Sequence, residues 1–214
     1  MGISERVVIV PAYNEARTIG KVVSQLQPFA KVIVVNDCSA DQTAELARAA
    51  GAEVVTHTSN KGYEGSLNSG FERAAEKGFL YALTFDADGQ HEASIVNSFF
   101  EPLESNRCDL VCGVRPHYAR FAELVIGQYF NLFFKVKDPL CGMKSYKLES
   151  YHRIGFFDSK RLVGAELLLR CLKMGDRVIQ VPVPIHERED KPRFGSTWKA
   201  NIKILKALIK AISI

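Results

Sequence analysis

The sequence lacks the marks of secreted, membrane-spanning and nucleic-acid-binding proteins. No apolar run is long enough to cross a bilayer, and the N-terminus has no long apolar segment of the kind that a signal peptide needs. The net charge of +4 over 214 residues is too small to indicate a nucleic acid as partner. We therefore expect a cytoplasmic protein, either soluble or peripheral at the cytoplasmic face of the membrane.

Signatures of disulfides, zinc sites and Walker-type loops are also missing. The five cysteines are odd in number and scattered, which indicates reduced thiols. Cys108 and Cys112 have no second ligand pair at zinc spacing, so no zinc site is expected. The segment Asn60 to Gly70 holds three glycines but neither a Walker A nor a dinucleotide-binding pattern. It is typical of a generic anion cradle at a helix N-terminus.

The sequence does contain a regular alternation of strand and helix patterns. Short apolar runs rich in β-branched residues predict buried strands at Val7 to Pro11, Lys31 to Asp37, Ala52 to His57, Leu80 to Asp86 and Asp109 to Val114. Helical patterns lie between them, at Ala16 to Leu26, Asp41 to Ala50, Ser66 to Lys77 and Ala93 to Ser105. This alternation predicts an α/β fold with a mostly parallel central sheet and helices on both faces.

Polar side chains follow three of these strands at their carboxyl ends. Tyr13 and Glu15 follow the first strand, Asp37 ends the second, and Asp86 and Asp88 follow the fourth. In open parallel sheets, ligands bind beyond the carboxyl ends of the strands, so we expect these residues to share one site. Two carboxylates one residue apart suit Mg²⁺ or Mn²⁺, and the diphosphate of a ligand would complete the coordination.

The second half of the chain is less regular. Helical patterns cover Phe121 to Val136 and Leu162 to Met174, and Arg177 to Val183 has the pattern of a strand. The segments Asp138 to Tyr146 and His186 to Thr197 have the composition of a turn-rich loop and a charged loop. We find no internal repeat and no low-complexity segment.

Residues 198–214 predict a basic amphipathic helix at the end of the chain. Its apolar face is formed by Ile202, Leu205, Ile209 and Ile212. A separate basic stripe is formed by Lys199, Lys203, Lys206 and Lys210. Such a helix, with Trp198 at its start, is typical of an element that lies on a membrane surface. The alternative is a helix that packs on its own domain and leaves its lysines in solvent.

Six motifs follow one another along the chain: PAYNE (Pro11 to Glu15), NDCSADQT (Asn36 to Thr43), DADGQH (Asp86 to His91), GVR (Gly113 to Arg115), DPLCGMK (Asp138 to Lys144) and RFGST (Arg193 to Thr197). Their order resembles that of the inverting GT-A glycosyltransferases of family 2, above all the dolichol-phosphate mannosyltransferases and the polyprenyl-phosphate glycosyltransferases. The resemblance implies a GT-A domain over residues 1–197. Its donor half would cover about 1–115 and its acceptor half about 116–197.

The resemblance implies that the substrate is a nucleoside-diphosphate sugar. Pro11, Tyr13 and Glu15 would hold the nucleoside, with Tyr13 beside the base and Glu15 on the ribose. Asp37 would accept a hydrogen bond from the edge of a pyrimidine or a purine, and neither uridine nor guanosine is preferred at this point. Cys38 stands where the family commonly has glycine, which affects the backbone of this loop because glycine tolerates a positive φ far better.

For the diphosphate, the resemblance implies a divalent metal, Mn²⁺ or Mg²⁺, on Asp86 and Asp88, with Gln90 as a further oxygen ligand. Asp88 is the firmest metal ligand and is therefore counted among the catalytic residues. Arg115 and Arg193 are candidates for contacts to the diphosphate oxygens. Arg115 has the alternative of a solvated charge at a strand end.

On the acceptor side, the resemblance makes Glu166 the candidate catalytic base. A base is needed only for an alcohol acceptor, because a lipid phosphate is already an anion. A polyprenyl phosphate, a lipid-linked glycan and a soluble glycan all remain open as acceptors. Two other functions also remain open, a nucleotidyltransferase that makes the nucleotide sugar and a catalytically silent nucleotide-sugar-binding protein.

Overall fold

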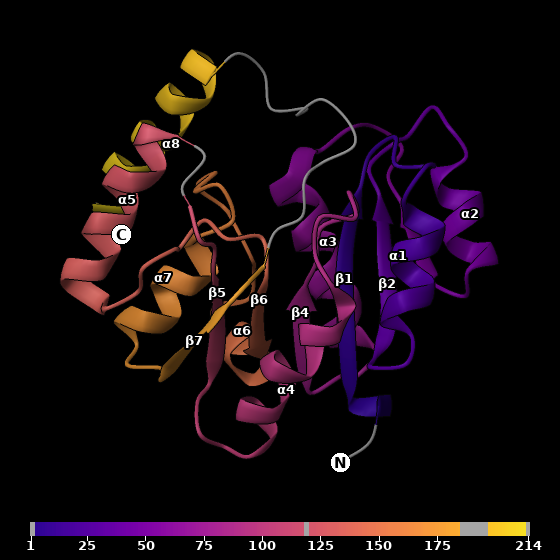
Figure 1. The fold of residues 1–214 in the computed structure, drawn as a ribbon, viewed down its shortest axis with the longest axis horizontal. Coiled ribbons are helices and arrows are strands. Elements are labelled where there is room, and N and C mark those ends of the chain that lie inside the picture. Colours follow the sequence, from indigo (N-terminus) through magenta and orange to yellow (C-terminus); the bar gives the residue numbers. More distant parts are fainter. Residues whose placement is uncertain (1–2, 118–119, 185–196, 213–214) are drawn as a thin grey trace.

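One seven-stranded sheet organises the chain in the computed structural model, which describes residues 3–117, 120–184 and 197–212 (Figure 1). The strand order is β3-β2-β1-β4-β6-β5-β7. The strands are β1 (Arg6–Ala12), β2 (Lys31–Asn36), β3 (Glu53–Thr56), β4 (Tyr81–Thr84), β5 (Leu110–Val114), β6 (Lys144–Lys147) and β7 (Val178–Pro182). Only β6 runs antiparallel to its neighbours among the described strands. The predicted α/β class with a mostly parallel sheet is therefore confirmed.

Helices cover both faces of this sheet (Figure 1). They are α1 (Ile19–Leu26), α2 (Thr43–Ala49), α3 (Gly62–Glu76), α4 (Val96–Glu104), α5 (Phe121–Phe134), α6 (Leu148–Ile154), α7 (Glu166–Lys173) and α8 (Thr197–Ile212), with short 3₁₀ turns at Ile3–Glu5 and Ala93–Ile95. Side chains of β1 alternate between the two cores: Ile9 packs in the core that contains Phe71 of α3, and Val8 in the core that contains Phe99 of α4. Burial on both faces explains why the strand is apolar throughout.

The strand β6 and the helix α6 were not predicted. Residues 138–146 have the composition of a turn-rich loop, yet their end forms the strand between β4 and β5. The sequence Lys-Ser-Tyr-Lys shows no apolar run because this strand buries Lys144 and Ser145, two polar side chains that find partners in the fold. Ser145 donates to the carbonyl of Phe99 (2.8 Å), and Lys144 Nζ donates to the carbonyl of Gly164 (3.1 Å).

The helix α3 begins earlier than its pattern predicts, at Gly62 instead of Ser66. Gly62 and Gly65 therefore lie in its first turns, and Gly70 lies where the helix crosses the sheet. A Cβ at Gly70 would overlap the side chain of Ile9, which shows that glycine is needed here for the close approach of α3 to β1.

The C-terminal helix α8 packs on α5 and leaves its predicted apolar face exposed. Ile204, Ala207 and Ala211 are buried against the domain. The exposed apolar residues are Ile202, Leu205, Ile209 and Ile212. The alternative in which the helix packs on its own domain is therefore confirmed for one face. The apolar stripe stays in solvent, and its place on a membrane surface stays a prediction. The side chain of Trp198 lies outside the described residues, and the division into donor and acceptor halves stays a prediction.

Candidate active site

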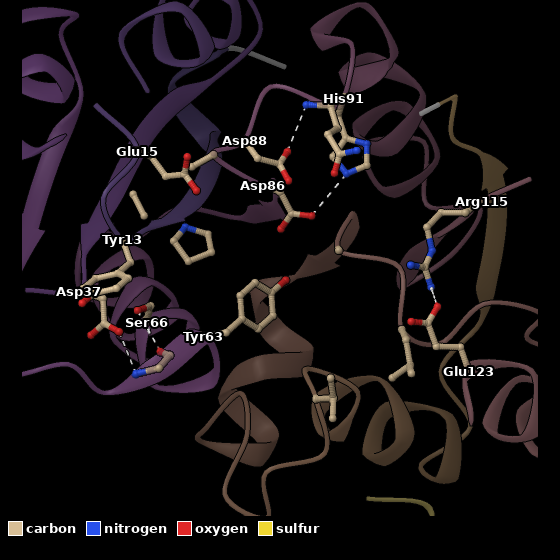
Figure 2. Close-up of a pocket in the computed structure, with 18 of the residues that line it drawn as sticks. Tyr13, Glu15, Asp37, Tyr63, Ser66, Asp86, Asp88, His91, Arg115 and Glu123 are labelled. Atoms are coloured by element: carbon tan, nitrogen blue, oxygen red, sulfur yellow. Dashed lines mark hydrogen bonds and ion pairs between the residues drawn. The ribbon is translucent and has the colours of Figure 1, made fainter. Parts of the chain in front are cut away.

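A cavity of about 610 Å³ lies at the carboxyl edge of the parallel strands. Its lining includes eight predicted site residues: Pro11, Tyr13, Glu15, Asp37, Asp86, Asp88, Gln90 and Arg115. Figure 2 shows Tyr13 and Asp37 on one side of the cavity and Arg115 on the opposite side. The fold brings these residues together from loops that are up to about a hundred positions apart in the sequence.

Asp86 and Asp88 lie side by side at the end of β4 (Figure 2). The backbone amide of Gln90 donates to Asp88 Oδ1 (3.1 Å), and His91 Nε2 lies 3.4 Å from Asp86 Oδ2. Burial opposes ionisation of Asp86, but the hydrogen bond with His91 and the charges of Lys144 and Arg115 outweigh it and lower its pKa. Asp86 is therefore ionised at neutral pH, and His91 buttresses the loop from a buried position.

Gly142 supports Asp86 from the other side. A Cβ at Gly142 would overlap the carboxylate of Asp86 and lie 2.8 Å from its Cγ, closer than real side chains approach. The carbonyl of Gly142 also accepts a hydrogen bond from Thr84 Oγ1 (2.6 Å), which ties this residue to the end of β4. Glycine is thus required at position 142 by the close approach of a carboxylate.

Tyr63, which the sequence analysis did not single out, also contacts Asp86. It enters the cavity from the first turn of α3, and Figure 2 shows its hydroxyl directed toward Asp86. Burial, together with the negative charge of Asp86 and a hydrogen bond to it, raises the pKa of Tyr63 well above its usual value. The phenol is therefore a protonated donor to Asp86. No sequence pattern signals this role, because a tyrosine in a helical segment most often belongs to the core.

The donor set at this corner fits a hard divalent cation. No cluster of three or more histidine, cysteine, aspartate or glutamate side chains suitable for a metal occurs among the described residues. Mg²⁺ and Mn²⁺ do not need such a cluster when one or two carboxylates and the phosphates of a substrate hold them. Asp86 and Asp88 provide those carboxylates beside the cavity, with the amide of Gln90 in the same lining.

The end of the cavity that holds Tyr13 and Asp37, which is predicted to bind the nucleoside, is formed by two loops that hydrogen-bond to each other. The amide of Asn14 donates to Ser39 Oγ (2.9 Å), and the amide of Ala40 donates to Asn14 Oδ1 (2.8 Å). Asn14 and Cys38 both adopt left-handed backbone conformations, with φ of 54° and 62°. The positive φ at Cys38 explains why glycine is common there in the family that the sequence resembles.

Asp37 is almost fully buried at this end, and its carboxylate has three donors. These are the ring of His57 and the backbone amides of Lys61 and Gly62, at 2.7, 2.7 and 2.8 Å. The glycine-containing start of α3 therefore does act as an anion cradle, but the anion that it holds is this protein's own aspartate. A free phosphate is not the ligand of these amides.

Arg115 lies at the opposite side of the cavity in an ion-pair network. Its guanidinium contacts Asp138 through Nε (2.7 Å) and Nη2 (2.9 Å) and Glu123 through Nη2 (3.1 Å). Burial disfavours the charged form, yet the bonds to Asp138 raise the pKa of Arg115 well above its usual value. The alternative of a solvated strand-end charge is wrong, because Arg115 is largely buried and paired. Arg193 lies outside the described residues.

Glu166, the candidate base, lies elsewhere. Its side chain is fully buried at the start of α7 and is not part of the cavity lining. It accepts hydrogen bonds from the amides of Ser159 (2.7 Å) and Lys160 (2.6 Å) and pairs with Arg170 (2.8 Å). These contacts hold the turn at 159–160. The base role of Glu166 stays a prediction, and nothing in the cavity lining supports it.

Comparison with known proteins identifies the family. The model of "Glycosyl transferase family 2" matches residues 7–155. The chain belongs to this family. It is a glycosyltransferase, so neither the nucleotidyltransferase nor the silent binding protein applies.

Two relatives and one solved structure show how far the similarity extends. A dolichyl-phosphate hexose transferase of Haloferax volcanii is 27% identical, over 95% of this chain and 92% of its own. An undecaprenyl-phosphate mannosyltransferase of Micrococcus luteus is 26% identical, over 85% and 83%. The glucosyl-3-phosphoglycerate synthase of Mycobacterium tuberculosis, in complex with Mn²⁺, UDP and glucosyl-3-phosphoglycerate, superposes with a TM-score of 0.78 at 21% identity, covering 99% of this chain and 81% of that one. The last comparison confirms the GT-A type of fold.

Proposed function

We propose that this glycosyltransferase moves a sugar from a nucleoside-diphosphate sugar to a polyprenyl phosphate, with inversion at the anomeric carbon. The observation that carries the proposal is the composition of one cavity, which joins a nucleoside end, a two-carboxylate corner and an end with guanidinium and apolar side chains. Relatives named for polyprenyl-phosphate and dolichyl-phosphate substrates support the choice of acceptor.

At the donor end, Pro11, Tyr13 and Glu15 would hold the nucleoside. An aromatic face packs on a base, and a carboxylate accepts hydrogen bonds from a ribose diol. Asp86 and Asp88, with Gln90, would hold Mn²⁺ or Mg²⁺. When bound, the ion would neutralise charge on the departing nucleoside diphosphate. The structural neighbour with Mn²⁺ and UDP supports this assignment.

At the acceptor end, the side chains favour a phosphate on an apolar chain. Arg120, which pairs with Glu123 (2.9 Å), lines the cavity together with the apolar residues Leu140, Val163 and Ile204. A phosphate oxygen would attack the anomeric carbon as the bond from that carbon to the diphosphate breaks, and no proton need be removed. The absence of Glu166 from the cavity lining agrees with an acceptor that needs no base.

The decisive experiment compares acceptors that differ only in the phosphate. With Mn²⁺ and a panel of radiolabelled UDP- and GDP-sugars, undecaprenyl phosphate is expected to become labelled and undecaprenol is not. Chelation by EDTA is expected to stop the labelling. Equal labelling of undecaprenol would contradict the phosphate acceptor, and unimpaired labelling in EDTA would contradict the metal.

We also propose that α8 lies on the membrane surface where such an acceptor resides. No helix among the described residues is long and apolar enough to cross a membrane. The apolar stripe of α8 is nevertheless exposed, with Ile209 at 70% and Ile212 at 60%. Phe121, Leu132 and Phe133 on the neighbouring α5 are also exposed, and Lys206 and Lys210 supply positive charge. Apolar side chains flanked by lysines are what anionic membrane surfaces attract.

Replacing Ile209 with glutamate is expected to weaken binding to vesicles with anionic lipids by about tenfold or more, because an exposed anchor loses its apolar burial in lipid. The melting temperature should hardly change, since Ile209 is exposed. Leu80→Glu is the matched control, because Leu80 is an exposed apolar residue just before β4, at the amino end of the parallel strands and beside Glu5. Vesicle sedimentation measures the binding of both variants. Equal binding of Ile209→Glu and the native protein would contradict the proposal that α8 lies on the membrane surface.

A further inference from the structure

The carboxylate of Asp37 has a fixed and incomplete set of hydrogen bonds. Its Oδ1 accepts from His57 Nδ1 and from the amide of Lys61, both at 2.7 Å, whereas Oδ2 accepts from the amide of Gly62 at 2.8 Å. Each carboxylate oxygen offers about two acceptor positions. Oδ1 is therefore full, and Oδ2 has one position left.

The carboxylate of Asp37 borders the end of the cavity that holds Tyr13. Asp37 is part of the cavity lining although only 3% of it is exposed, and Figure 2 shows it next to Tyr13. A buried carboxylate held by two backbone amides cannot rotate to offer both oxygens without losing these bonds. A ligand beside Tyr13 therefore meets an acceptor for one N–H group only.

We propose that Asp37, limited in this way by His57, selects a base with a single imino N–H and so favours uridine over guanosine nucleotides. Uracil presents one donor, N3–H, between two carbonyls. Guanine presents two adjacent donors, N1–H and the 2-amino group, which a carboxylate satisfies only by offering both oxygens. Cytosine presents an acceptor at N3 and would place it against the negative carboxylate. This inference rests on the proposed function, because it names the donor base for the same cavity.

His57 is the specificity-determining residue in this account. Because a carboxylate only accepts hydrogen bonds, Nδ1 of His57 carries the proton, and Nε2 then accepts from Ser69 Oγ at 2.9 Å. Ser69 thus fixes the tautomer that fills Oδ1. His57 is buried behind Asp37 and is not part of the cavity lining, so it acts through Asp37 as a positioning residue.

Calorimetric titration of the native protein in Mn²⁺ tests the selection with four probes. UDP is expected to bind about tenfold tighter than GDP, CDP and N3-methyl-UDP. GDP would leave one N–H donor unpaired, CDP would place an acceptor against the carboxylate, and N3-methyl-UDP lacks the N–H group. GDP binding as tightly as UDP, or N3-methyl-UDP binding like UDP, would overturn the inference and leave the glycosyltransferase proposal intact. Failure of every nucleoside diphosphate to bind would instead contradict the proposed function.

Variants at His57 separate positioning from folding. His57→Leu frees one acceptor position on Oδ1, so the ratio of UDP to GDP affinity is expected to fall toward one. His57→Asn retains an N–H donor near the Nδ1 position and is expected to keep most of the native ratio. A purely structural role would lower the melting temperature of both variants without changing the ratio. An unchanged ratio in folded His57→Leu would therefore overturn the role of His57.

Discussion

Asp88→Asn is expected to lower the rate of sugar transfer about a hundredfold to a thousandfold while leaving the fold intact. The substitution keeps the shape of the side chain and an oxygen that can accept from the amide of Gln90. It removes the negative charge that a divalent ion requires, and losing one electrostatic element of this kind typically reduces turnover a hundredfold to a thousandfold or more. Initial rates at saturating donor, with and without added Mn²⁺, measure the effect.

Asp109→Asn is the matched control for Asp88→Asn. Asp109 precedes β5 at the edge of the sheet opposite the cavity and pairs with Lys147 and Arg177. The same change of charge there is expected to leave transfer within about twofold of native, because Asp109 is not part of the cavity lining. Full activity of Asp88→Asn would contradict the metal corner, and equal loss in both variants would indicate a general effect of charge.

Gly142→Ala is expected to reduce transfer about a hundredfold although it adds only one methyl group. The new Cβ would overlap the Asp86 carboxylate and displace it from the position set by Tyr63 and His91. A displacement of about 1 Å in a positioned group can lower a rate by about two orders of magnitude. The value of kcat should fall and the Mn²⁺ concentration for half-maximal activity should rise, because Asp86 would approach the ion in the wrong geometry.

Gly20→Ala serves as the control for Gly142→Ala. Gly20 lies in α1, and a Cβ there would meet no atom within 4 Å. Alanine in a helix is about 0.5–1 kcal/mol more favourable than glycine, so this variant should be slightly more stable and as active as native protein. Native kcat and native metal dependence in Gly142→Ala would contradict the requirement for glycine beside Asp86.

Much of the N-terminal half was predictable because its strands are buried on both faces. Apolar runs such as Val7 to Pro11 and Lys31 to Asp37 have no other common explanation, and ligands bind at the carboxyl ends of such strands. The convergence of Tyr13, Glu15, Asp37, Asp86 and Asp88 on one cavity followed from that rule.

The rest could not be predicted because it depends on contacts between distant segments. β6 buries Lys144 and Ser145 against carbonyls that only the folded chain provides. The need for glycine at position 142 arises from Asp86, more than fifty positions earlier. Glu166 matches a family position by sequence, yet local amides and Arg170 occupy its carboxylate. A sequence shows which groups can do chemistry, and the packing decides which of them reach the cavity.

The most direct test of the central claim is a Mn²⁺ titration followed by electron paramagnetic resonance, with and without the nucleoside diphosphate that binds tightest. The native protein is expected to bind Mn²⁺ weakly alone and at least tenfold tighter with the nucleotide, since two carboxylates and the diphosphate share the ion. Asp88→Asn is expected to lose this enhancement. Nucleotide binding that is equally tight without Mn²⁺ and in Asp88→Asn would contradict a metal–diphosphate site at Asp86 and Asp88.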